Sequence, residues 1–89
     1  MSDYLTLKAD IIKNFGTPCA VVDLNVLEKN ISRVQKICDN AGLSNRPHIK
    51  THKSGEVARM QIAAGASGVT CQKLGEAEVM AAAGIKDIL

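Results

Sequence analysis

The residues with the clearest chemical potential lie in the segment RPHIKTHKS, which runs from Arg46 to Ser54. Arg46, His48, Lys50 and His52 occupy every second position of this segment. Alternate side chains of a β-strand point to opposite faces, so a strand here would place these four basic or titratable groups on one face. An ordinary half-buried strand does not need four nitrogen-bearing side chains. The spacing therefore indicates a partner that is anionic or that reacts with an amine.

Lys50 is the strongest candidate for chemistry in this segment. In a parallel barrel it would sit at the carboxyl end of a strand, where such barrels hold their active sites. Partial burial beside other cationic groups would disfavour the ammonium form, and the free amine could then form a Schiff base with an aldehyde. A solvated surface lysine is the alternative that spacing alone leaves open. His48 and His52 would lie roughly 13 Å apart on a strand, so they could not bind one metal ion together.

The elements that must position Lys50 alternate between strand-like and helix-like patterns. Short apolar runs predict four strands, at residues 18–22, 47–50, 68–71 and 87–89. Apolar residues at helical spacing predict three intervening helices, which carry residues 27–41, 57–64 and 74–81. Asn25 and Glu28 form a capping-box pattern for the first helix, and Thr51 or Ser54 can cap the second. Three Ala-Gly pairs, at 41–42, 64–65 and 83–84, predict the helix ends.

This order of elements predicts an α/β fold with parallel strands joined by right-handed crossovers. The close, regular spacing of the helix ends favours the N-terminal portion of a (β/α)8 TIM barrel over a doubly wound sheet. We expect residues 1–16 to be an N-terminal lead-in and residues 17–89 to be the first βα units of the barrel. Because the sequence stops within a predicted strand that no helix covers, we also expect the rest of the barrel in a longer chain.

Composition narrows the classes of protein to consider. With 46% hydrophobic and 22% charged residues, the 89-residue chain has globular composition. A net charge of +2 and only two aromatic residues argue against a nucleic-acid partner, and no apolar run approaches the roughly 20 residues of a membrane span. There is no signal-peptide core, so we expect a cytoplasmic protein. The three cysteines lack CxxC spacing, which indicates reduced, largely buried thiols: Cys19, Cys38 and Cys71.

Three stretches together resemble a known enzyme family: TPCAVVDLNVLEKNI, RPHIKTHKS and GVTCQKLGEAEVMAAAGIKDIL. They are similar to the N-terminal part of the alanine-racemase-like, fold-type III enzymes that use pyridoxal 5'-phosphate, in the branch of D-threonine aldolases and eukaryotic-type D-serine dehydratases. The resemblance implies a (β/α)8 barrel followed by a β-rich C-terminal domain. It also implies that Lys50 is the catalytic residue and holds the cofactor as a Schiff base. Gln72 is expected to face the cofactor or, alternatively, to bond the backbone where the next helix begins.

The resemblance further implies a lyase that acts on small β-hydroxy-D-amino acids. The leading expectation is aldolase cleavage to glycine and an aldehyde. D-serine dehydratase (ammonia-lyase) activity, amino-acid racemization and non-catalytic carriage of pyridoxal phosphate are the alternatives, in that order. A divalent metal is possible in the full-length enzyme with ligands outside this chain, so no metal-ligating residue is predicted here. We expect the full-length protein to be a homodimer and these 89 residues alone to be inactive.

Overall fold

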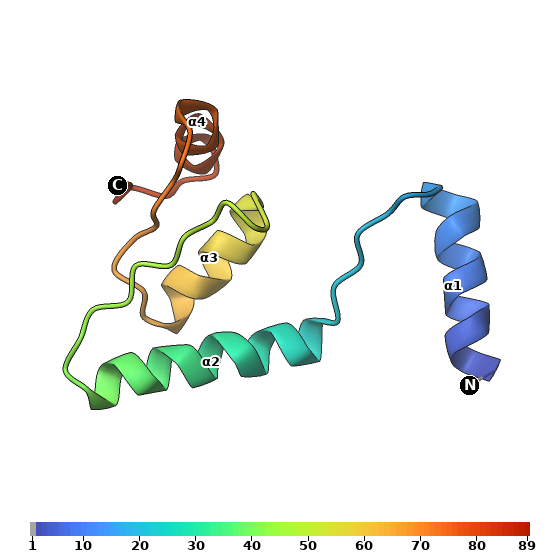
Figure 1. Cartoon of the computed structure of the whole chain (residues 1–89), viewed down its shortest axis with the longest axis horizontal. Helices are drawn as coiled ribbons and strands as arrows, with labels where there is room; N and C mark the ends of the chain where they lie inside the picture. Colours follow the sequence, from blue (N-terminus) through green and yellow to red (C-terminus); the bar gives the residue numbers. More distant parts are fainter. Residues whose placement is uncertain (1) are drawn as a thin grey trace.

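Helices carry the regular secondary structure of the molecule (Figure 1). The computed structural model describes residues 2–89 and contains α1 (Ser2–Phe15), α2 (Leu24–Asn40), α3 (Gly55–Ala64) and α4 (Leu74–Ala82). α3 packs against both α2 and α4, whereas α1 stands apart and is joined to α2 by an extended link. No helix within residues 2–89 is both long and apolar enough to cross a membrane.

The three predicted helices are confirmed as α2, α3 and α4, and two of their N-termini have side-chain caps. Ser54 caps α3, where its Oγ accepts the Val57 N–H at 3.2 Å. The capping box predicted at Asn25 and Glu28 is wrong. Asp23 caps α2 instead, because it has the extended backbone that an N-cap residue needs and its Oδ1 accepts the Asn25 N–H at 2.9 Å.

The three predicted helix ends are also confirmed. Gly42, Gly65 and Gly84 follow α2, α3 and α4 with φ values of 70°, 123° and 93°. Residues with a Cβ rarely adopt a positive φ, which is why glycine is favoured at these three positions. Each of the three turns therefore reverses the chain toward the next extended segment.

The prediction of four regular strands is wrong, although three of the four segments pair in parallel. Within residues 2–89 the pairing consists of single bridges, His48 with Thr70 and Val69 with Ile88. The supporting backbone bonds include Ile49 N–H to the Thr70 carbonyl and Leu89 N–H to the Val69 carbonyl, both at 3.0 Å. A ladder needs several successive pairs, and each pair of neighbouring segments forms one bridge. The order of the three segments is nonetheless that of neighbouring parallel strands.

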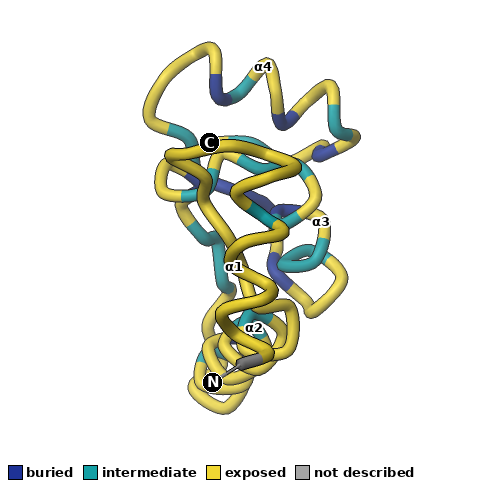
Figure 2. Tube along the Cα trace, turned by 90° about the vertical axis from the view of Figure 1, so that its right-hand side faces the viewer, coloured by how far each residue is buried: buried dark blue, intermediate teal, exposed yellow. Residues whose placement is uncertain are grey.

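The first predicted strand, at residues 18–22, has no strand partner among the described residues. It is exposed throughout, together with most of α1, as the yellow tube of Figure 2 shows. The prediction that the cysteines are largely buried is wrong for Cys19, which lies in this exposed segment. The core is formed instead by the paired segments and the helices that cover them: Ile49, Ala58, Val69, Met80 and Ile85.

Candidate functional site

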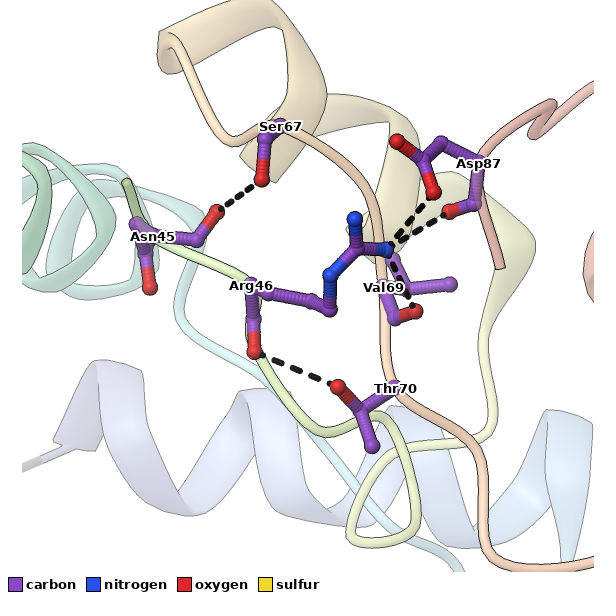
Figure 3. Close-up of polar contacts among 6 residues, drawn as sticks. All are labelled: Asn45, Arg46, Ser67, Val69, Thr70 and Asp87. Carbon is purple, nitrogen blue, oxygen red and sulfur yellow. Dashed lines mark hydrogen bonds and ion pairs between the residues drawn. The ribbon is translucent and has the colours of Figure 1, made fainter. Parts of the chain in front are cut away.

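Arg46 lies at the amino end of the paired segments and joins all three of them (Figure 3). Its Nη1 is 2.9 Å from Asp87 Oδ1 and donates to the Val69 and Asp87 carbonyls, both at 3.4 Å. The hydrogen bond and charge of Asp87 raise the pKa of Arg46, and the Arg46 guanidinium lowers the pKa of Asp87. Arg46 is therefore a structural clamp at the edge opposite to that reached by Lys50.

The predicted face of four basic side chains is consequently wrong. Arg46 turns to Asp87, and the bridge at His48 is the last before the chain enters a turn at Lys50. The ring of His52 is directed to α3, where its Nε2 lies 3.3 Å from Gln61 Oε1. The extended backbone ends at residue 49, so the alternation of a strand does not place Lys50 and His52 on the same face as His48.

Lys50 lies on a tight turn directly after the paired part of its segment. The Lys53 N–H donates to the Ile49 carbonyl at 2.8 Å and closes this turn, with Lys53 at φ 51°. Because the neighbouring segments run parallel, the turn at Lys50 and the turn at Gln72 lie past the same edge. Lys50 is exposed and has no ion-pair partner within residues 2–89. Its amine is thus accessible, and its burial within a barrel stays a prediction.

Glu76 connects these two turns, and the sequence patterns did not single it out. Its Oε1 accepts the backbone N–H groups of Gln72 at 2.8 Å and Lys73 at 3.1 Å. Its Oε2 lies 3.7 Å from the Lys53 ammonium on the turn that carries Lys50. The available signal was its position three residues after Lys73, where a glutamate commonly bonds back to the start of a helix.

The surroundings of Glu76 favour its charged form. The Gln72 N–H contributes most to lowering the pKa of Glu76, and the Lys73 N–H and the Lys53 ammonium lower it further, while burial opposes them. Burial and the negative charge of Glu76 raise the pKa of the Cys71 thiol and so favour its protonated form. The Gln72 side chain is exposed, and its predicted contact with a cofactor stays a prediction. No three potential metal-ligating side chains gather within residues 2–89.

Acidification is expected to destabilise the protein through Glu76 and Asp87. Both carboxyls have a pKa in the folded state below the ordinary values of 4.5 and 3.8. Their contribution to the free energy of unfolding is complete above those ordinary values and is lost as the pH falls through the lowered ones. Urea unfolding of the full chain from about pH 6 down to pH 3 measures this loss. The E76Q and D87N variants should show a shallower decline, and an unchanged slope in both would contradict the assignment.

The family model for the alanine racemase N-terminal domain matches residues 22–89. The chain belongs to this family. Alanine racemase N-terminal domains are TIM barrels, so the parallel segments and covering helices form part of such a barrel. The predicted fold is thus confirmed at the level of the family, while the described residues contain helices and single bridges in place of full strands.

The relatives that match this chain in sequence include aldolases and dehydratases. The chain is 50% identical over 80 residues to D-threo-3-hydroxyaspartate dehydratase of Delftia sp. (strain HT23), a match that covers 90% of this chain and 21% of that protein. It is 46% identical over 74 residues to 3-hydroxy-D-aspartate aldolase of Paracoccus denitrificans, covering 82% of this chain and 19% of the relative. The chain therefore spans about a fifth of the length of these relatives.

Solved structures give the same picture for the backbone. The crystal structure of D-threonine aldolase from Filomicrobium marinum superposes with a TM-score of 0.78 at 42% identity, over 81% of this chain and 20% of that one. A structure of a D-threo-3-hydroxyaspartate dehydratase mutant in the metal-free form superposes with a TM-score of 0.79 at 51% identity. The match covers 84% of this chain and 20% of that one. At these identities the local geometry of the family domain is shared, and a metal is implied for that dehydratase.

Proposed function

We propose that the full chain carrying this sequence is a pyridoxal-phosphate-dependent lyase acting on β-hydroxy-D-amino acids, with Lys50 as the residue that binds the cofactor aldehyde. The observation that carries this proposal is the position of Lys50 in the RPHIKTHKS segment. It follows a parallel segment of a family barrel, on a closed turn, with its amine exposed and unpaired within residues 2–89. Relatives that are aldolases and dehydratases support the reaction class.

The chain's own residues fit the cofactor in two respects. The Lys50 amine is open to an aldehyde. Gln72 follows the neighbouring parallel segment, so its side chain can contact a group bound beside Lys50. The cofactor, when bound, would accept the electron pair left on the α-carbon of an amino acid. Glu76 would keep the turns of Lys50 and Gln72 at a fixed separation.

We propose D-threonine aldolase-like cleavage to glycine and an aldehyde as the specific reaction. Dehydration to a keto acid and ammonia is the second candidate, because a dehydratase is among the relatives with high identity. Racemization or non-catalytic cofactor carriage would follow if neither set of products forms. We further propose that residues 17–89 are the first βα units of the barrel, that any metal ligands lie outside this chain, and that the full-length protein is a homodimer.

Borohydride reduction of the full chain with bound pyridoxal phosphate tests the assignment of Lys50. Reduction fixes the cofactor to its lysine, and peptide mapping then identifies the modified position. We expect the pyridoxyl group on Lys50, since Lys53 is engaged with Glu76 and Lys73 lies on the next turn. Modification of Lys53 or Lys73 in place of Lys50 would overturn the assignment.

A further inference from the structure

Two histidine rings hold the ends of the turn that carries Lys50. Nδ1 of His48 accepts the Lys50 N–H at 3.1 Å, and Nδ1 of His52 accepts the Ser54 N–H at 2.9 Å. Each ring thus bonds the backbone two residues further along the chain. Between them, the Lys53 N–H bonds the Ile49 carbonyl at 2.8 Å and Lys53 takes a positive φ of 51°. The turn is therefore bonded at its start, its centre and its end.

These contacts define the form of both imidazoles. A ring nitrogen that accepts an N–H carries no proton itself, so in each of these bonds the ring proton lies on Nε2. In His52 this Nε2–H points to Gln61 Oε1 of α3 at 3.3 Å, which fixes the ring from both sides. The His48 ring is exposed, so its Nε2–H remains accessible beyond the turn.

We propose that His48 and His52 are positioning residues for Lys50, and this inference rests on the proposed function. His48 fixes the backbone N–H of Lys50 itself, and with it the direction in which the long side chain leaves the backbone. His52 fixes the far end of the turn by bonding the amide of Ser54, the residue that caps α3. The two rings act through their Nδ1 atoms on the backbone, and neither needs to touch the reacting atoms.

Asparagine and glutamine variants separate this role from one that uses Nε2. The Oδ1 of asparagine lies close to where histidine places Nδ1 and can accept the amide two residues on. The Oε1 of glutamine lies close to where histidine places Nε2 and is too far along the side chain for the same local bond. H48N should therefore behave as wild type and H48Q should not, whereas a role through Nε2 predicts the opposite order.

Amide hydrogen exchange in the full chain measures the turn without any cofactor. Loss of one hydrogen bond is expected to speed exchange at the Lys50 amide roughly fivefold in H48Q, with H48N within about twofold of wild type. H52Q and H52N should differ in the same way at the Ser54 amide. Equal exchange in the asparagine and glutamine variants would overturn the inference. In the unsubstituted protein, nitrogen-15 spectra should find no proton on Nδ1 of either ring, and a protonated Nδ1 in either ring would also overturn it.

The second measurement is the rate at which pyridoxal phosphate is captured at residue 50, followed by reduction and mapping. Slower capture in H48Q with rescue in H48N supports the positioning role. Capture that is equal in both variants, with cofactor on Lys50, overturns the role and leaves the proposed function intact. If the cofactor maps to another lysine while amide exchange is still faster in H48Q than in H48N, the proposed function is overturned. The bonds by which the histidines hold the turn would still stand.

Discussion

Lys50→Arg in the full chain is expected to reduce cleavage of β-hydroxy-D-amino acids by roughly 10³-fold or more, the scale on which loss of a covalent catalytic group acts. Arginine keeps the positive charge but cannot serve as an amine nucleophile, because its guanidinium stays protonated. Borohydride reduction of this variant should leave residue 50 unmodified. The assay follows the aldehyde or the keto acid released from substrate.

The matched control is the same substitution at an exposed lysine far from the turn. Lys36 lies on α2 and is exposed, so Lys36→Arg should retain wild-type activity. Activity of Lys50→Arg close to that of the control would mean that charge, not the amine, is what position 50 supplies. The proposed function would then lose the residue on which it rests.

Local chemistry explains why the helix boundaries could be predicted. Gly42, Gly65 and Gly84 end their helices because the positive φ that each adopts is a property of the residue itself, independent of distant contacts. The cap of α3 is local as well, because the Ser54 hydroxyl accepts an amide only three residues away. Asp23 and Asn25 are both good capping residues by type, so the sequence pattern alone predicts the N-cap of α2 two residues too late. Only the backbone angles distinguish them.

Contacts across long separations explain what the sequence could not predict. The alternation of basic residues indicated a single face, but Arg46 pairs with Asp87, which lies 41 positions away. Neither residue carries a local signal for that contact. The same holds for the link between Lys53 and Glu76, which joins two turns that only the parallel order brings together. Family resemblance pointed to Lys50, whereas the contacts by which His48 and His52 hold its turn emerge only from the structure.

Gly68→Ala is expected to lower the free energy of unfolding by about 1–3 kcal/mol, the usual cost of forcing extra atoms into a packed site. Gly68 is buried beside the Arg46 clamp, and a Cβ added there would lie 2.4 Å from the Asp87 carbonyl oxygen and 2.6 Å from Arg46 Nη1. The first neighbour is backbone and cannot move without shifting the paired segment. Chemical denaturation of the full chain measures the loss, provided that unfolding is two-state.

Gly75→Ala provides the matched control because nothing lies within 4 Å of a Cβ at that position. Gly75 is the second residue of α4, where alanine is favoured over glycine by less than the roughly 1 kcal/mol of a helix interior. The same change in composition should therefore stabilise at residue 75 and destabilise at residue 68. The Gly68→Ala, Asp87→Asn double variant then tests the cause, since both changes act on the clamp and their effects should be less than additive. Full additivity would mean that the added Cβ acts through the Asp87 backbone alone, and a Gly68→Ala protein as stable as wild type would contradict the close packing at residue 68.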